Sequence, residues 1–288
     1  MKGNFLYYLC SFSIFIFIIA CSIDEKGRDV MSKEDTSSEI ASVTKSKWDK
    51  LSQKKIYFGH MSVGYNIMDG VSDIIKENPD LSLNIVETNN KEDFRSSIFA
   101  HSKNGENTKP KTKIDAFVNL MENGLGNKVD IAFFKLCYVD ILKDTDVDEV
   151  FNYYKTSMKT LKKKFPKTLF IHTTAPLTAE RMDRGIKIRI KDMIKAIIGR
   201  MTTKERHIIE NIKRYRFNEL IRNEYSDKII FDLAKIESTY PDGKREVSEK
   251  DGNKHYALIP AYTYDGGHLN ERGRKIIAEK LLVFLAEL

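Results

Sequence analysis

Cysteine is scarce in this chain, with three residues among 288, and this scarcity limits how the fold can be held together. Cys10 and Cys21 belong to the apolar stretch at the N-terminus and its boundary, which leaves Cys137 as the one cysteine of the remaining sequence. No disulfide forms within that part, so its stability must come from a hydrophobic core. We expect Cys137 to be a small buried core residue rather than a nucleophile, because it lies in an apolar run.

Long runs of one charge are also missing. The chain holds 48 Lys and Arg against 41 Asp and Glu, a formal net charge of +7 that is spread along its length. The densest basic run is Lys162–Lys164, which we interpret as the solvated face of a helix. A nucleic-acid partner is therefore not expected.

The longest uncharged apolar run, Phe5–Ala20, stands behind Lys2 at the N-terminus. A short basic start, an apolar core and small residues at the boundary are typical of an export signal. An uncleaved anchor helix is the alternative, but a membrane span needs ~20 apolar residues. The sequence "IIAC" also resembles the lipobox of bacterial lipoproteins. This resemblance implies that residues 1–20 are a signal peptide, that Cys21 is lipidated, and that the exported protein is held at a membrane of the bacterial cell envelope.

The sequence after the apolar run divides into a polar segment and a long mixed segment. Residues 21–46 are rich in Ser, Lys, Glu and Asp and have little apolar periodicity, so we expect a flexible tether. Residues 47–288 are long enough for one large α/β domain.

Strand-like and helix-like segments alternate along residues 47–288, which predicts a parallel sheet covered by helices on both faces. The fold class expected is α/β, a three-layer αβα arrangement around a mostly parallel five-stranded sheet. The strands expected are Lys54–Gly59, Leu81–Thr88, Val129–Ile141, Thr168–Ala175 and Lys228–Ala234. The helices expected are Ser62–Glu77, Lys111–Asn123, Val147–Phe165, a long basic region Ala179–Tyr225, and Asn270–Leu288; Tyr240–Tyr264 is expected to be a long loop.

One serine stands where the first expected strand turns into the first helix. Ser62 lies in "GHMSVG", which is close to the G-x-S-x-G elbow except that His60 replaces the first glycine. A serine hydroxyl becomes a nucleophile when a base removes its proton, and a backbone N–H at a helix start can stabilise an oxyanion. By itself the pattern also fits a serine that only caps the helix.

A second group of polar residues precedes the last helix. Asp265 and His268 lie three residues apart in "DGGHLNERG". A serine hydrolase needs an imidazole to accept the hydroxyl proton and an acid to hold that imidazole in the right tautomer. A short turn can present both groups, although the alternative is an ordinary loop with an exposed histidine.

A serine after the first strand, followed by D-x-x-H before the last helix, resembles the SGNH (GDSL-like) hydrolase superfamily over about residues 54–288. The resemblance implies an SGNH/flavodoxin-like fold, Ser62 as nucleophile, His268 as base and Asp265 as its orienting acid, with no cofactor and no metal. The family's third-block asparagine has no counterpart in "FFKLCYVDI". We therefore expect the oxyanion hole from the N–H groups of Ser62 and Gly105 and the amide of Asn107, in the polar segment Ala100–Pro110.

Three further polar residues lie at or near strand ends and are candidates for the cleft. His60 stands where the relatives carry aspartate, Lys135 interrupts an apolar strand, and His172 lies late in another strand. The alternative for each histidine is a satisfied core residue. Lys135 must reach solvent, a ligand or a carboxylate, for which Asp140 is the candidate, because an unpaired buried lysine is costly.

These patterns predict an exported serine esterase that acts on ester-linked acyl groups, including O-acetyl groups, of a small molecule or a glycan. Three alternatives stay open: a non-catalytic surface lipoprotein that binds a glycan or a partner, a glycan O-acetyltransferase, and a metal-dependent hydrolase. The last would use His60, Asp265 and His268, but the sequence lacks H-E-x-x-H and its six histidines are dispersed.

Overall fold

The computed structural model describes residues 39–180 and 185–288. The predicted signal peptide, the predicted lipidation of Cys21 and most of the predicted tether lie outside the described residues. The tether was, however, predicted to extend to residue 46, and this boundary is wrong. Ile40 and Val43 are buried in the hydrophobic core, so the folded domain already includes Glu39.

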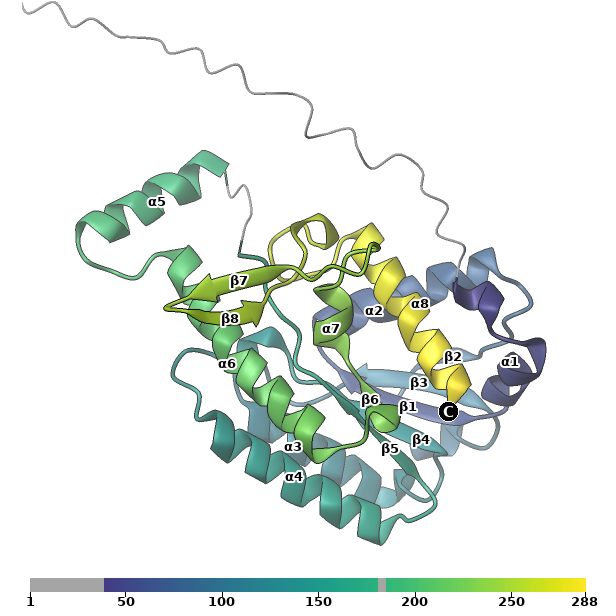
Figure 1. The fold of residues 1–288 in the computed structure, drawn as a ribbon. Helices are drawn as coiled ribbons and strands as arrows, with labels where there is room; N and C mark the ends of the chain where they lie inside the picture. Colours follow the sequence, from purple (N-terminus) through teal and green to yellow (C-terminus); the bar gives the residue numbers. More distant parts are fainter. Residues whose placement is uncertain (1–38, 181–184) are drawn as a thin grey trace, which may run out of the picture. The chain divides into compact units, whose positions relative to one another are not determined.

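A six-stranded sheet with the order β2-β3-β1-β4-β5-β6 lies at the centre of the domain, and all its paired strands are parallel (Figure 1). The strands are β1 (Lys55–His60), β2 (Ile85–Glu87), β3 (Ile98–Lys103), β4 (Ile131–Phe134), β5 (Leu169–Thr173) and β6 (Ile230–Phe231). The predicted three-layer class is confirmed, but the prediction of five strands missed β3. The polar end of β3, His101–Lys103, had been assigned to a loop.

The strands alternate their side chains between two hydrophobic clusters, as the two-residue period of a strand requires. In β1, Ile56 and Phe58 pack into the cluster on one face and Tyr57 into the cluster on the other. In β4, Phe133 and Phe134 divide in the same way. Both faces of the sheet are therefore buried, which explains the continuous apolar runs in its sequence.

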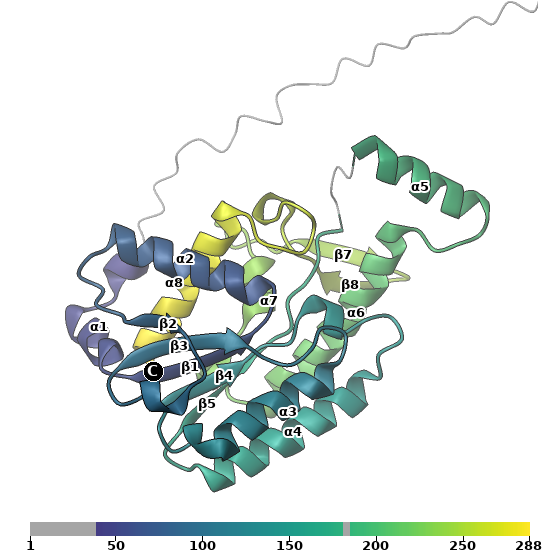
Figure 2. The same ribbon diagram turned by 180° about the vertical axis from the view of Figure 1, so that it is seen from behind.

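Helices cover each face of the sheet (Figures 1 and 2). One cluster takes side chains from α1 (Lys45–Ser52), α2 (Val63–Glu77), α7 (Leu233–Glu237) and α8 (Glu271–Glu287). The opposite cluster takes them from α3 (Pro110–Leu120), α4 (Val147–Lys164) and α6 (Thr203–Glu224). Short turns of 3₁₀ or π helix lie at Glu39–Ser42, Lys91–Asp93, Met121–Leu125, Tyr138–Asp140, Asp227–Ile229 and Pro260–Tyr262.

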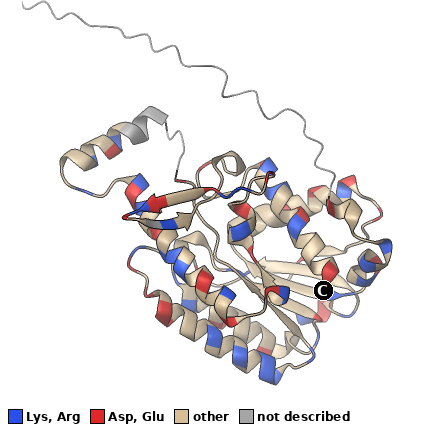
Figure 3. Ribbon diagram, viewed as in Figure 1, with Lys and Arg blue, Asp and Glu red and all other residues tan. Residues whose placement is uncertain are grey.

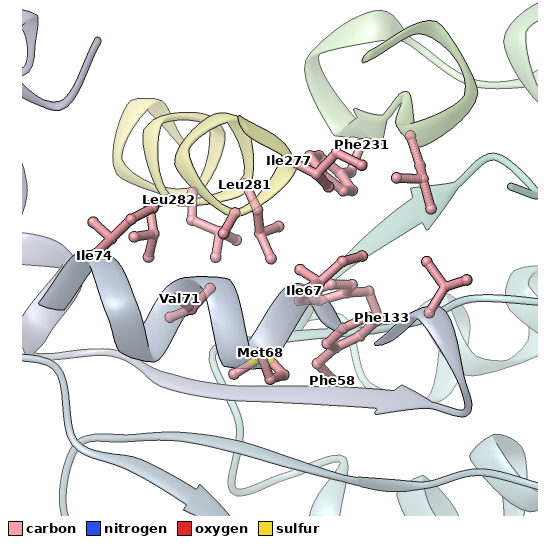
Figure 4. Packing of buried hydrophobic residues seen from close by; sticks show 14 of the residues in the cluster. Phe58, Ile67, Met68, Val71, Ile74, Phe133, Phe231, Ile277, Leu281 and Leu282 are labelled. Atoms are coloured by element: carbon pink, nitrogen blue, oxygen red, sulfur yellow. The ribbon is translucent and has the colours of Figure 1, made fainter. Parts of the chain in front are cut away.

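The close packing of α2 on α8 brings an early segment of the domain against its C-terminal helix. Ile67, Val71 and Ile74 of α2 face Ile277, Leu281 and Leu282 of α8 in the apolar layer of Figure 4. Gly70 makes this approach possible, because a Cβ at that position would lie 2.4 Å from the backbone oxygen of Arg274. The start of α2 and the turn before α8 belong to distant parts of the sequence.

Three expected segments differ from what the structure contains. The apolar run Val129–Ile141 forms strand only at β4, and a 3₁₀ turn follows at Tyr138–Asp140. The long helical region is divided into α5 (Gly185–Ile197) and α6. The expected loop Tyr240–Tyr264 contains an antiparallel hairpin of β7 (Val247–Lys250) and β8 (Asn253–Tyr256). Hydrophobic periodicity identifies these segments but fixes their ends poorly.

Both signs of charge are spread over the helices of the domain (Figure 3). Within residues 39–180 and 185–288, no helix combines the length and the apolar character needed to cross a membrane.

Candidate active site

Ser62 lies two residues beyond the carboxyl end of β1, at the N-cap position directly before α2. Its backbone has φ 52° and ψ −109°, in the half of conformational space that favours glycine. Its hydroxyl makes no capping hydrogen bond to the helix. The side chain is therefore not used as a helix cap, and the sharp turn aims it elsewhere.

The hydroxyl of Ser62 meets His268, which in turn meets Asp265. The Oγ of Ser62 lies 2.5 Å from Nε2 of His268, and Nδ1 of His268 lies 2.6 Å from Oδ2 of Asp265. An ionised Asp265 accepts a hydrogen bond from the N–H at Nδ1. The other ring nitrogen, Nε2, then carries no proton and accepts a hydrogen bond from the serine hydroxyl. The structure thus brings together the three residues that the sequence predicted as a catalytic set.

Asp265 is held by backbone groups of its own turn. Its Oδ1 accepts hydrogen bonds from the N–H of Gly267 at 2.9 Å and of His268 at 2.7 Å. Partial burial acts to raise the pKa of Asp265, but the hydrogen bonds from the His268 ring and from these backbone groups outweigh it and lower that pKa below its usual value. Asp265 is consequently ionised at neutral pH.

The two glycines between Asp265 and His268 are both needed. Gly266 has φ 95°, a conformation that side chains rarely adopt. The backbone of Gly267 packs against the ring of Tyr138, since a Cβ at this position would lie 2.6 Å from that ring. The sequence "DGGH" therefore encodes a turn that only this composition closes without strain.

Asn66 connects this turn to the helix that begins at Ser62. Its Oδ1 accepts a hydrogen bond of 3.2 Å from the N–H of Leu269, next to His268. Sequence reasoning did not single out Asn66. The available signal was its position four residues after Ser62, in the first turn of α2.

Two tyrosines that sequence reasoning also missed flank the imidazole of His268. The ring of Tyr138 lies edge-on to it, with centroids 5.8 Å apart, and the ring of Tyr264 lies nearly parallel to it at 6.0 Å. Tyr264 is 63% exposed, so its ring borders the site on the solvent side. Its place in the same short stretch as Asp265 was the only hint in the sequence.

The residues predicted for the oxyanion hole lie in a loop that is tied to α3 and to the segment after β4. Gly105 has φ 64°, and a Cβ at this position would lie 2.6 Å from the backbone of Lys113; Asn107 accepts a hydrogen bond of 2.9 Å from Nζ of Lys113. Lys113 forms a buried ion pair of 2.6 Å with Asp140, whose carboxylate also accepts from the N–H of Cys137.

Cys137 completes a path of contacts back to Ser62, because its thiol contacts the backbone oxygen of Met61 at 3.5 Å. It is a free and buried thiol, as expected for a core residue. The path links the loop of Gly105 and Asn107 to the serine turn through Lys113, Asp140 and Cys137, while the contact described for the Asn107 side chain is with Lys113. A cavity of about 330 Å³ opens next to Asp140, and Ser62 does not line it.

The predicted placement of His60 in the cleft is wrong, since its side chain is fully buried. Its Nε2 lies 2.9 Å from Nδ1 of His101. Burial, with smaller contributions from the charges of Lys135 and His101, lowers its pKa to about 2. His60 packs against the turn that follows Ser62, because a Cβ at Gly64 would lie 2.3 Å from the Cβ of His60.

The predicted placement of His172 in the cleft is also wrong. Its ring is buried, stacks on Tyr225 with centroids 3.4 Å apart, and has Nδ1 2.7 Å from the hydroxyl of Tyr154. Burial lowers its pKa to about 3. His172 is a satisfied core histidine, the alternative that the sequence had left open.

Lys135 is buried as well, and its expected partner is taken. Its Nζ donates to the sulfur of Cys137 at 3.5 Å, whereas Asp140 pairs with Lys113. Burial is the main cause that lowers the pKa of Lys135. The expectation that it reaches Asp140 or a cleft is therefore corrected. A cation that the sequence had not flagged, Lys113, occupies that place.

Among the described residues, no group of three or more His, Cys, Asp or Glu side chains is arranged to hold a metal ion. His60 and His268, two of the groups that a metal site would have needed, are engaged with His101 and Ser62.

No protein-family model matches this chain, and no curated protein matches it. Several solved structures are similar to it. One is a protein from Streptococcus pneumonia that is described as a platelet activating factor. It is 16% identical over 84% of this chain and 90% of that chain, with a TM-score of 0.46. Another is a protein from Desulfitobacterium hafniense DCB-2 attributed to the G-D-S-L lipolytic family, at 10% identity over 79% and 97% of the two chains, with a TM-score of 0.40.

A third similar structure is the periplasmic domain of a lipopolysaccharide acetyltransferase from Salmonella ser. Paratyphi A, at 12% identity over 80% of this chain and 82% of that chain, with a TM-score of 0.42. Similarity of this extent concerns the arrangement of sheet and helices, so the chemistry has to be inferred from the side chains of this chain.

Proposed function

We propose that this protein is a serine acyl hydrolase of SGNH type. The observation that carries the proposal is the line of contacts from Ser62 Oγ to His268 Nε2 and from His268 Nδ1 to Asp265. Ser62 meets an Asp–His pair whose histidine lies 206 residues further along the sequence, in the order that nucleophilic catalysis requires and with an ionised acid at the far end.

In the proposed reaction, the oxygen of Ser62 attacks the carbonyl carbon of an ester while Nε2 of His268 accepts the hydroxyl proton. The tetrahedral intermediate collapses, the C–O bond to the alcohol breaks, and His268 returns the proton to the leaving alcohol. Water then attacks the acyl-serine, again with His268 as base, and the free acid leaves. Asp265 holds the imidazole and stabilises the imidazolium in both halves.

The N–H of Ser62 and the N–H of Gly105 are the proposed donors to the oxyanion, with the amide of Asn107 as a third. A backbone N–H at the start of α2 has no partner within the helix and benefits from the helix dipole. Loss of one such donor costs about 10²–10³ in rate in serine enzymes. The contacts of Gly105 and Asn107 with Lys113 keep their loop in place.

The substrate proposed is an ester-linked acyl group, including O-acetyl, on a glycan or a small molecule at the bacterial cell envelope. The exposed ring of Tyr264 supports a carrier that stacks on it, because a sugar ring presents an apolar face to an aromatic side chain. The export signal and Cys21 lipidation predicted from the sequence would hold the enzyme at a membrane, where such carriers are concentrated.

Transfer of the acyl group to a sugar hydroxyl is the second candidate. The side chains of His268 and Asp265 are 31% and 42% exposed, so the hydroxyl group of an acceptor larger than water has access to His268. A non-catalytic binding protein, the remaining alternative, would leave the short contact of Ser62 with His268 without a use.

The test is labelling by a fluorophosphonate together with hydrolysis of a panel of esters that differ in acyl length and in sugar carrier. We expect Ser62→Ala to abolish both labelling and hydrolysis, a loss of about 10⁶-fold in kcat. Ser72→Ala is the matched control, because Ser72 lies on the same helix and donates only to the backbone of Met68.

Hydrolysis that survives in Ser62→Ala, or no labelling of the folded chain, would contradict the proposal. Adding sugar acceptors to the panel separates the two candidates: an acylated sugar as the main product indicates transfer, and free acid indicates hydrolysis.

A further inference from the structure

The proposed function assigns no role to α5 (Gly185–Ile197). Large apolar residues recur along it at spacings of three and four, the pattern of one helix face. They continue past its end as Ile198 and Met201. This stripe consists of Ile190, Met193, Ile194, Ile197, Ile198 and Met201.

The stripe is exposed throughout its length. Its members are 42–76% accessible, with Ile197 the most exposed, and they make up most of the large exposed apolar side chains in the described parts of the chain. Isolated apolar residues on a surface need no explanation, but a contiguous row of them marks a binding surface.

The helix that carries the stripe is well formed and fixed to its successor. Its end has paired bonds, from Gly199 N–H to the oxygen of Ala196 and from Arg200 N–H to that of Lys195, with Gly199 at φ 67°. This is the usual closure of a helix by glycine. Asp192 accepts hydrogen bonds from the backbone and hydroxyl of Thr203 at the start of α6.

The charge around the stripe is positive. Residues 185–201 contain five Lys and Arg and one acidic residue, Asp192. The carboxylate of Asp192 is already engaged with Thr203 and, at 3.5 Å, with Lys195. Lys191 and Arg200 therefore remain as exposed cations beside the exposed apolar row.

We propose that α5 lies in the headgroup region of an anionic lipid surface, with the stripe inserted among the acyl chains and the basic side chains at the phosphates. An apolar row flanked by Lys and Arg is the composition of helices that lie in a membrane interface. Long basic side chains bury their methylene stems and keep the charge at the headgroups. Pairing with a second copy is disfavoured, because it would bring two basic helices together.

This surface is separate from the predicted N-terminal lipid and complements it. A single acyl signal gives weak and reversible attachment, and stable anchoring takes two. The helix would also fix how the domain is oriented on the membrane, which a flexible tether alone cannot do.

The test places one tryptophan on each side of the helix in the full chain. Ile197→Trp reports on the stripe, and Ala196→Trp is the matched control at the neighbouring exposed position off the stripe; Trp48 is buried and common to both. Each chain is bound to vesicles of brominated phosphatidylcholine, with or without an equal amount of phosphatidylglycerol. The readouts are the emission maximum and the quenching by bromine.

With phosphatidylglycerol present, we expect a blue shift and strong quenching of Trp at 197 and little of either at 196. Lys191→Gln and Arg200→Gln should each lower the ratio of inserted to free helix roughly fivefold. The predicted N-terminal lipid would attach the chain to both kinds of vesicle alike, so a difference between positions 197 and 196 reports on α5.

Three results would overturn the proposal. The first is no quenching at position 197, and the second is equal quenching at both positions. The third is shielding of position 197 without quenching by lipid. The shielding group would be a second copy, in a lipid-free dimer that Ile197→Glu dissociates, or the chain's own N-terminal apolar run. Hydrolysis of a soluble ester is a separate readout that should be unchanged in the α5 variants, so failure here leaves the proposed reaction untouched.

Discussion

Ser62 stores strain that a residue in an ordinary helix cap would not carry. Its φ of 52° and ψ of −109° lie where side chains are rare, and its neighbours leave little room for the turn to relax. Gly64 packs directly on His60, and the thiol of Cys137 contacts Met61. Strain of this kind is stable only when the surrounding packing imposes it, and it concentrates at functional positions.

The first prediction at this scale concerns that strain. Ser62→Gly and Ser62→Ala both lose the hydroxyl and its hydrogen bond, but only glycine adopts a positive φ freely. We expect the glycine variant to be about 1 kcal/mol more stable than the alanine variant, while both are inactive. Urea unfolding of the two variants measures the difference. An alanine variant that equals or exceeds the glycine variant would mean that the turn is unstrained.

At the scale of elements, the site depends on the contact between α2 and α8. Ser62 directly precedes α2, and His268 lies three residues before the start of α8. The apolar layer of Figure 4 fixes the two helices against each other, and Asn66 adds a hydrogen bond to Leu269 at the end nearest the site. The hydroxyl and the imidazole meet because these helices do.

Gly70→Ala tests that dependence. The added Cβ would lie 2.4 Å from the backbone oxygen of Arg274, so α2 and α8 must move apart. We expect a loss of about 1–3 kcal/mol in the free energy of unfolding, as for overpacking in a core, and a fall in activity from a displaced His268. Lys76→Ala is the control, an exposed position on the same helix. Equal stability of both variants with the parent chain would show that the helices are not in tight contact.

At the scale of the whole molecule, buried ionisable groups set how stability depends on pH. His60 and His172 remain neutral in the fold, with pKa values of about 2 and about 3, whereas an unfolded histidine titrates near 6.5. The unfolded chain therefore binds more protons below about pH 6.5, and stability falls as the pH is lowered. Glu237 acts in the opposite direction, because burial raises its pKa to about 8.

Glu237 yields a prediction for the alkaline side. In the folded chain the Glu237 carboxyl keeps its proton up to about pH 8, while a glutamate in the unfolded chain loses its proton near pH 4.3. Stability should therefore fall by about 1.4 kcal/mol per pH unit between about pH 6.5 and 8. Glu237→Gln keeps an oxygen to accept from the N–H of Leu177 and should be nearly flat over this range. Unfolding by urea at a series of pH values compares the two, and parallel curves would contradict the shift.

Local sequence was sufficient for the fold class and for three of the site residues. The alternation of apolar strands and amphipathic helices indicates a parallel αβα arrangement, since each pattern reports which faces an element buries. Ser62 and the Asp265–His268 turn were accessible for a similar reason. Each is set by a few neighbouring residues, the elbow between strand and helix in one case and two glycines in the other.

Contacts between distant segments decided the remainder. His60, Lys135 and His172 lie at or near strand ends, yet they are buried against His101, Cys137 and Tyr225, and no local pattern distinguishes a strand end at the cleft from one in the core. Asp140 pairs with Lys113 rather than with Lys135 of its own segment. The sequence by itself determined which elements form and which turns carry reactive groups. Only the tertiary structure decided which of those groups face one another, because packing between elements, and not periodicity within them, sets distances across the sheet.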